Sequence, residues 1–157
     1  MNNNFEKYIV DFALDSENPK TNYFLAVEYD NFNQLSAAIS HYLRCAERTK
    51  DKLLQYECLL RCGIAVKKQK TRVYTEKSFF QNAINILPNR PEAYYLLAET
   101  LISLNCKHDA YTMICIGENL ISNNYIPLPN NIIDFNLNIF ILKKLEYAKN
   151  IGLEIFN

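Results

Sequence analysis

Residues 87–101 read LPNRPEAYYLLAETL, and this stretch decides the fold. Pro88 cannot continue a helix, because proline lacks the N–H that an interior helical residue donates. Pro91 suits the first position of a helix, where the missing N–H would have had no partner. The residues after Pro91 are mostly apolar and contain no glycine or proline. The stretch therefore predicts the end of one helix and, almost at once, the start of another.

The composition is that of a helical globular protein. The 157 residues include 49% hydrophobic and 22% charged side chains, with only three glycines. A β-rich domain of this length needs more glycine at its turns. Because 17 basic residues balance 17 acidic ones, no net field draws the chain to nucleic acid or an anionic membrane. We expect a single all-α domain over residues 1–157.

Targeting and membrane signals are missing from the sequence as it stands. The first residues, MNNNFEKYIVDFAL, lack the basic start and long apolar run of a secretory signal. No run of about 18 apolar residues predicts a membrane span. The five cysteines are an odd number, which argues against a disulfide framework. These features predict a reducing, cytoplasmic setting.

Helical periodicity recurs roughly every 15 to 18 residues along the chain. The turns between these segments are short, which makes neighbouring helices antiparallel. The pattern predicts a helix over 4–14, three helical hairpins over 19–49, 52–88 and 90–122, and a last helix over 131–155. The last helix is expected to cap the array or to form part of a fourth repeat.

Large and small residues repeat at a constant offset of 72 positions. The matching sets are Leu25, Ala26, Tyr29, Ala38, Tyr42 and Cys45 against Leu97, Ala98, Leu101, Ala110, Ile114 and Gly117. A middle unit near half this offset contains Cys62, Gly63, Val66, Phe80 and Ala83. Small residues opposite large ones allow two helices of a hairpin to approach closely. The pattern therefore predicts three stacked helical hairpins.

The third unit, Tyr94-x2-Leu97-Ala98-x2-Leu101-x8-Ala110-x3-Ile114-x2-Gly117, resembles the tetratricopeptide repeat (TPR) family. Pro88 stands where that family places the proline that closes the preceding unit. The first unit departs from the family pattern, with Asn22 where an aromatic residue is usual and Lys50 where proline is usual. The resemblance covers roughly residues 19–122. It implies a right-handed superhelical solenoid with flanking capping helices at both ends.

The resemblance also implies a concave groove, lined by the first helix of each hairpin, that binds a protein segment. By register its lining residues are Lys20, Tyr23, Phe24, Val27, Asp30, Glu57, Leu60, Arg61, Ile64, Lys67, Glu92, Tyr95, Leu96, Glu99 and Ile102. Two alternatives remain open: the groove is free, or a terminal helix of the chain fills part of it. Tyr23, Val27, Leu60, Ile64, Tyr95 and Glu99 occupy the places of the chaperone-tail clamp of some TPR domains, which disfavours that function.

A second resemblance concerns residues 18–31, 41–61 and 86–99, which read NPKTNYFLAVEYDN, HYLRCAERTKDKLLQYECLLR and ILPNRPEAYYLLAE. They are similar to TPR segments appended to glycosyltransferases in phage and large-virus sequences. This similarity implies an accessory module that works with a glycosyltransferase. No catalytic domain accompanies it in these 157 residues.

Other candidate sites have simpler explanations. The cluster Lys67, Lys68, Lys70 and Arg72 suits an RNA backbone or, more simply, a solvated turn. Cys58 and Cys62 stand four apart on one helix, but no second pair at zinc spacing accompanies them, so we expect core cysteines. His41 and His108 belong to no catalytic motif.

We therefore predict no catalytic residue, metal or cofactor. The predicted function is non-catalytic protein–protein interaction through the groove. The alternatives are an accessory domain of a glycosyltransferase and an RNA-binding helical repeat.

Overall fold

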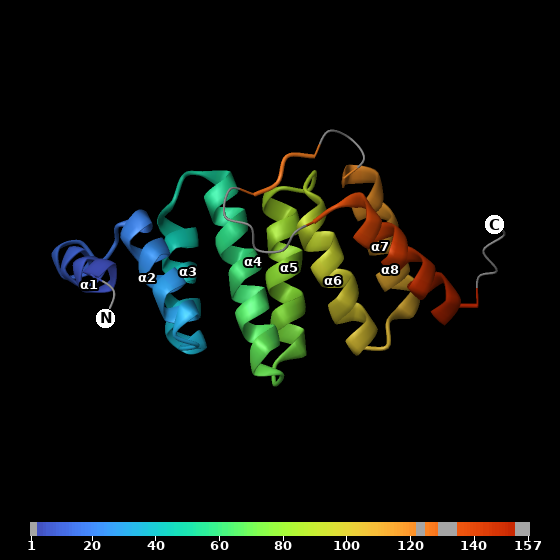
Figure 1. Ribbon diagram of the computed structural model, residues 1–157, viewed down its shortest axis with the longest axis horizontal. Helices are drawn as coiled ribbons and strands as arrows, with labels where there is room; N and C mark the ends of the chain where they lie inside the picture. The colour runs from blue at the N-terminus through green and yellow to red at the C-terminus, as the bar shows by residue number, and fades with distance from the viewer. Residues whose placement is uncertain (1–2, 122–124, 129–134, 153–157) are drawn as a thin grey trace. The chain divides into compact units, whose positions relative to one another are not determined.

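The structure is a computed structural model that describes residues 3–121, 125–128 and 135–152. Within these ranges all regular secondary structure is α-helical (Figure 1). The helices are α1 (Asn3–Leu14), α2 (Pro19–Asn31), α3 (Leu35–Arg48), α4 (Lys52–Gln69), α5 (Val73–Ile86), α6 (Pro91–Ser103), α7 (Lys107–Ile121) and α8 (Leu137–Asn150). The chain divides into two compact units, Met1–Ile86 with α1 to α5 and Leu87–Asn157 with α6 to α8.

Side-chain caps and prolines set the helix starts. The Asn18 carboxamide oxygen accepts hydrogen bonds from the backbone N–H groups of Lys20 and Thr21, at 3.0 and 3.2 Å, and Pro19 is the first residue of α2. Asp51 caps α4 in the same way. Helix α5 ends at Ile86 and α6 begins at Pro91, so Pro88 lies in the connection between these helices and Pro91 is the first residue of α6.

The two hairpin turns that lie 72 residues apart have the same backbone. Asn33 and Asn105 both adopt the left-handed conformation, with φ of 57° and 59°. In each turn the following residue donates its N–H back to the helix: Gln34 to the Tyr29 carbonyl at 2.8 Å and Cys106 to the Leu101 carbonyl at 2.9 Å. Asparagine tolerates this conformation better than other non-glycine residues. The offset read from the sequence is thus repeated in the backbone.

Small residues lie where helices cross closely. Ala26 and Ala38 are completely buried in the core of the first unit, together with Tyr42 and a group of cysteines. Gly63 of α4 lies directly against the Phe80 ring of α5, and an added Cβ would stand 2.8 Å from Phe80 Cζ. This glycine allows the second hairpin to close.

Helix α1 packs on the first hairpin through three aromatic side chains. Phe5 meets the Tyr29 ring edge to face, Tyr8 stacks on Phe24, and Phe12 meets His41 edge to face. The contacting positions are 5, 8 and 12, and the intervening Ile9 is exposed.

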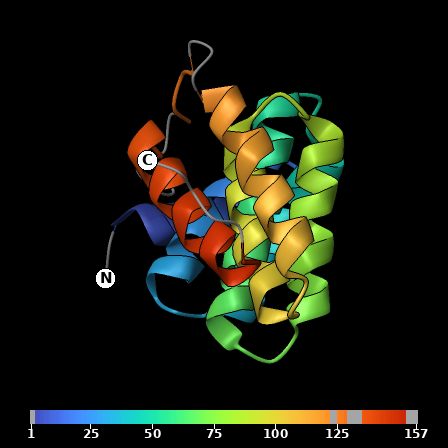
Figure 2. The ribbon, with the colours of Figure 1, turned by 90° about the vertical axis from the view of Figure 1, so that its right-hand side faces the viewer.

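In the second unit α8 packs beside α7 (Figures 1 and 2). The Phe140 ring of α8 lies against Gly117 of α7, and Lys144 pairs with Glu118 at 2.7 Å. The last helix begins at Leu137, later than the predicted start at 131, because Asn136 is extended and caps it by accepting from the Ile139 N–H. Residues 131–134 and 153–155 of that prediction lie outside the described ranges.

Candidate functional site

Helix α2 carries the first five predicted groove residues, and they differ in exposure. Lys20 is exposed and the Phe24 side chain is 43% exposed. Val27 and Asp30 are half-buried. Tyr23, by contrast, is buried in the core of the first unit. The reachable part of this helix is therefore a basic, an aromatic and an aliphatic side chain in successive turns.

Helix α4 carries the second set. Arg61, Ile64 and Lys67 are half-buried, while Glu57 is buried and Leu60 has no exposed area at all. Leu60 is thus a core residue and does not line a groove. The physical reason is that α4 packs between α3 and α5 and buries side chains around most of its circumference. Residues reachable on both helices define the α2–α4 face: Lys20, Phe24, Val27, Ile64 and Lys67.

A buried polar network lies beneath this face and joins α2 to α4. The Tyr23 hydroxyl donates to Glu57 Oε1 at 2.5 Å, and Arg61 Nε donates to the same oxygen at 3.0 Å. The Arg61 guanidinium also lies over the rings of Tyr23 and Tyr42, 5.9 and 5.8 Å from their centroids. The i,i+4 spacing of Glu57 and Arg61 is the only sign of this network in the sequence.

Several side chains of this network have strongly shifted pKa values. Burial, followed by the hydrogen bond to Glu57, raises the pKa of the Tyr23 hydroxyl far above its ordinary range. Burial also raises the pKa of Tyr42. Burial by itself lowers the pKa of Arg61, but the neighbouring Tyr42, Tyr23 and Glu57 outweigh it, and the pKa rises overall. The site is therefore a fixed ion pair flanked by neutral phenols, an arrangement suited to holding helices together.

The predicted basic cluster is partly engaged within the protein. Lys68 pairs with Asp30 across α4 and α2 at 2.8 Å. Arg72 donates to the Gln69 carboxamide oxygen at 2.7 Å. Lys70 ends α4 in the left-handed conformation. Lys68 and Arg72 thus have partners on the protein itself.

In the second unit the predicted groove residues of α6 meet other parts of the same unit. Tyr95 is half-buried, and its ring meets Phe135 and Phe140 edge to face, with centroids 5.5 and 5.3 Å apart. Lys143 of α8 lies 4.0 Å from the Glu99 carboxylate. Leu96 is buried in the core, and Ile102 is half-buried.

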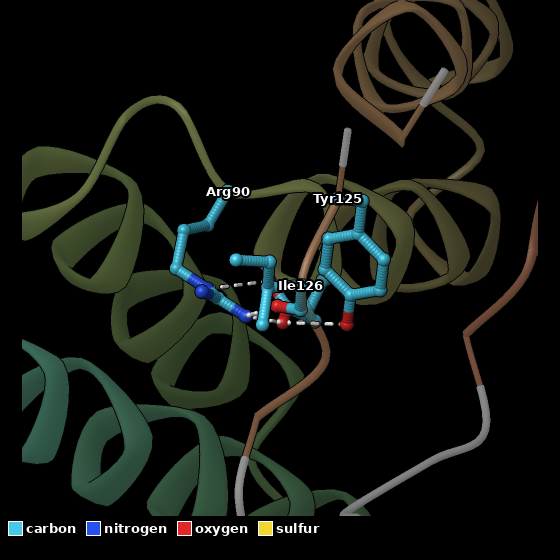
Figure 3. A network of polar contacts seen from close by, with 4 residues as sticks. Arg90, Tyr125 and Ile126 are labelled. Atoms are coloured by element: carbon cyan, nitrogen blue, oxygen red, sulfur yellow. Dashed lines mark hydrogen bonds and ion pairs between the residues drawn. The ribbon is translucent and has the colours of Figure 1, made fainter. Parts of the chain in front are cut away.

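Glu92, predicted as a groove residue, is fully buried by a segment of its own chain. Arg90 Nε donates to Glu92 Oε2 at 3.2 Å, and the Tyr125 hydroxyl donates to Glu92 Oε1 at 2.9 Å. Arg90 also donates to the Ile126 carbonyl at 3.1 Å, which ties residues 125 and 126 to the start of α6 (Figure 3). Of the two alternatives left open by the sequence, contact with the chain's own C-terminal part therefore holds for α6.

Asn22, noted above as a departure from the family pattern, is a structural residue. It is fully buried, and its amide donates to the carbonyls of Ser16 and Asn18 at 2.8 and 2.9 Å. Because the amide nitrogen is the donor in these two bonds, the carboxamide oxygen is the acceptor in the third, which His41 Nδ1 donates at 2.9 Å. The His41 ring in turn stacks on Tyr29. This histidine has a packing role between α2 and α3.

The cysteines Cys45, Cys58 and Cys62 are free thiols buried in the core of the first unit. In the described part of the chain no cluster of three or more histidine, cysteine or acidic side chains is placed to hold a metal ion. None of the helices in the described ranges is long and apolar enough to span a membrane.

No protein-family model and no curated protein matches the sequence. Among solved structures, the crystal structure of MamA, a TPR-like helical repeat protein, matches with a TM-score of 0.74. The match covers 95% of this chain and 77% of that chain at 15% sequence identity. At this identity the likeness concerns the fold alone. It confirms the predicted all-α, TPR-like fold class.

Proposed function

We propose that the protein is a non-catalytic interaction module that binds a segment of a partner protein on the α2–α4 face. The observation that carries the proposal is the combination of reachable apolar and basic side chains on two joined helices. Phe24 and Ile64 supply apolar anchors, and Lys20 supplies an exposed charge. Such a mixture suits a protein segment better than a small polar substrate.

The charges of the face favour an acidic partner segment. The two acidic residues that were predicted for the groove on these helices, Asp30 and Glu57, already pair with Lys68 and Arg61 at 2.8 and 3.0 Å. The acids next to the face are thus neutralised within the protein, whereas Lys20 is exposed on it. A segment with one apolar anchor flanked by Asp or Glu would complement it. Because the charge is exposed, affinity should fall as salt concentration rises.

The proposal is confined to the first unit. The equivalent helix of the second unit, α6, has Glu92 in contact with Tyr125, and Tyr95 in contact with Phe135 and Phe140. A partner could reach these positions only by displacing those residues. On the α2–α4 face Tyr8 of α1 stacks on Phe24, yet the Phe24 side chain remains 43% exposed and can be reached by a partner.

The two alternatives have less support. Association with a glycosyltransferase rests on the sequence resemblance alone. RNA binding would use the basic cluster, but Lys68 and Arg72 already have partners in the protein. A single turn with two engaged cations offers few phosphate contacts.

The test is affinity capture from native lysate with three forms of the protein. One form is wild type, the second carries Lys20→Glu and Phe24→Ser on the α2–α4 face, and the third carries Lys107→Glu and Ile116→Ser. Lys107 and Ile116 are exposed on α7, so the third form makes the same chemical changes elsewhere. Circular dichroism checks that all three remain helical.

We expect a partner that wild type and the α7 form retain and the face form loses. Cross-links from that partner should map to Lys20 or Lys67, and high salt should weaken capture. A partner held equally by the face form and wild type would refute the proposal. So would a partner lost equally from both altered forms.

A further inference from the structure

An open hollow of about 400 Å³ lies in the first unit between α1 and the turn that joins α2 to α3. The described residues that line it are Phe5 of α1, Tyr29 of α2, and Phe32 and Gln34 of the turn. Three of these four side chains are aromatic, and none of the four carries a charge. The volume is in the range of small-ligand sites.

The Phe5 ring stands nearly at right angles to each of the other two rings. The planes of Phe5 and Tyr29 meet at 86° with centroids 5.4 Å apart, and those of Phe5 and Phe32 at 78° with centroids 5.6 Å apart. The rings meet in edge contacts rather than stacks, and the hollow beside them is open. A guest in the hollow meets aromatic surface on more than one side.

The walls are held in place before any ligand arrives. Tyr29 is backed by the His41 ring, stacked at 5.4 Å with an interplanar angle of 9°. Asn33, with φ of 57°, turns the chain so that Gln34 donates its N–H to the Tyr29 carbonyl at 2.8 Å. Preorganised walls lose little entropy on binding. Phe32 is 51% exposed, so a ligand can reach its ring from solvent.

The third repeat provides an internal comparison. Its turn has the same backbone, with Asn105 at φ of 59° and Cys106 donating to the Leu101 carbonyl at 2.9 Å. The residues equivalent to Phe32 and Gln34 there are Leu104 and Cys106. The turn therefore closes without an aromatic residue at the position of Phe32, and the fold itself does not require that ring.

From this arrangement we infer that the hollow binds an alkylated ammonium group, of the kind found in choline or trimethyllysine. The faces of aromatic rings carry partial negative charge, so they attract cations, and several rings around one alkylammonium group recognise it by charge and by apolar contact together. None of the four described side chains that line the hollow is charged, so they do not repel a cation. This inference is independent of the α2–α4 face and does not depend on it.

The test compares choline with 3,3-dimethylbutan-1-ol, which has the same shape but a carbon atom in place of the nitrogen and no charge. Each is titrated into the whole protein, into the tens of millimolar range, and followed by NMR. We expect choline to bind roughly tenfold more tightly than the neutral alcohol. Its methyl protons should show intermolecular Overhauser effects to the rings of Phe5, Tyr29 and Phe32.

Variants link the binding to the hollow. Phe32→Leu, which copies Leu104 of the third repeat, should weaken choline binding about fivefold or more, whereas Phe32→Trp should retain or strengthen it, because tryptophan is the best cation-binding ring. Tyr74→Leu serves as the matched control, since Tyr74 is an exposed aromatic residue on α5 that does not line the hollow. Circular dichroism confirms that each variant is folded.

A trimethyllysine peptide then distinguishes the source of the ammonium group. Tighter binding of the peptide than of choline points to a modified protein, and equal or weaker binding to a small molecule. The inference is overturned if the neutral alcohol binds as tightly as choline, if Phe32→Leu leaves choline binding unchanged, or if no choline signal reaches the three rings.

Discussion

Glu57 and Glu92 stand 35 residues apart at equivalent positions of successive repeat units, and each is a buried carboxylate that accepts a hydrogen bond from a tyrosine hydroxyl. The donor for Glu57 is Tyr23 of the preceding first helix, whereas the donor for Glu92 is Tyr125, from the segment after α7. An arginine completes each site. In both units a buried acid thus attaches a neighbouring segment to a first helix.

Removing the Tyr23 hydroxyl should therefore destabilise the first unit. Tyr23→Phe keeps the ring over Arg61 but deletes the donor to Glu57, which lies 2.5 Å away. A hydrogen bond to a buried charged group contributes about 1.5–3 kcal/mol, and Arg61 still pairs with Glu57, so we expect a loss near the lower end of that range. Urea unfolding measures it. Tyr74→Phe, at an exposed position, controls for the loss of a hydroxyl, and equal midpoints for the two variants would contradict the role assigned to Tyr23.

Gly63→Ala should also destabilise the protein, although alanine favours helix. The added Cβ would stand 2.8 Å from Phe80 Cζ and 2.9 Å from Cδ1, closer than real Cβ contacts. Overpacking of this kind typically destabilises by about 1–3 kcal/mol, and the helix propensity of alanine offsets roughly 1 kcal/mol of it. We expect a net loss of up to about 2 kcal/mol in urea unfolding.

A double variant tests whether contact with the Phe80 ring causes the destabilisation of Gly63→Ala. Gly63→Ala combined with Phe80→Leu should be less destabilised than the sum of the two single variants, because the smaller side chain makes room for the Cβ. Strict additivity would show that the Phe80 ring is not what the methyl group meets.

Sequence reasoning reached the helices and the repeat because local signals specify them. Pro88 and Pro91 mark a helix boundary in any context, and Gly63 is small because a partner helix must approach. The contact of Glu92 with Tyr125 could not be predicted from the sequence, because it joins residues 33 apart through a segment without helical periodicity. Register also gives the direction of a side chain on a helix but not what covers it, which is why Leu60 was expected on a surface and lies in the core.

Protonation of His41 should make the protein less stable in mild acid. Burial, followed by the charge of Arg44, lowers the pKa of this histidine below its ordinary 6.5. The unfolded chain then binds a proton at a higher pH than the folded protein, so this contribution to stability is present above pH 6.5 and is lost as the pH falls through the lower folded-state value. NMR titration of the imidazole should give a midpoint below 6.5.

The variant Arg44→Gln tests the order of the two causes. It should raise the midpoint of His41 but leave it below the ordinary value, because burial is the larger cause and is unchanged. Full return to 6.5 would show that the charge, and not burial, dominates. His108→Gln removes the other histidine at an exposed position and identifies the two NMR signals.

The raised pKa of Tyr95 should make the protein lose stability in strong alkali. Burial, followed by the negative charges of Glu99 and Glu146, raises the pKa of its hydroxyl from 10.0 to about 12. Between these values the unfolded chain loses the proton while the folded protein still holds it. Stability that is complete below pH 10 therefore falls as the pH rises towards 12. Tyr95→Phe has no such proton, so its free energy of unfolding should fall less steeply with pH over this interval.

Other buried tyrosines, Tyr147 among them, are shifted in the same direction, so the comparison must be made between variants. The difference in slope between Tyr95→Phe and Tyr74→Phe isolates the position, because both lose one phenol and only the first loses it beside Phe135, Phe140 and two carboxylates. Glu99→Gln should move the ionisation of Tyr95, followed by ultraviolet absorbance, to lower pH. Identical slopes for the two phenylalanine variants would mean that the contact between α6 and the C-terminal residues does not bury Tyr95 in solution.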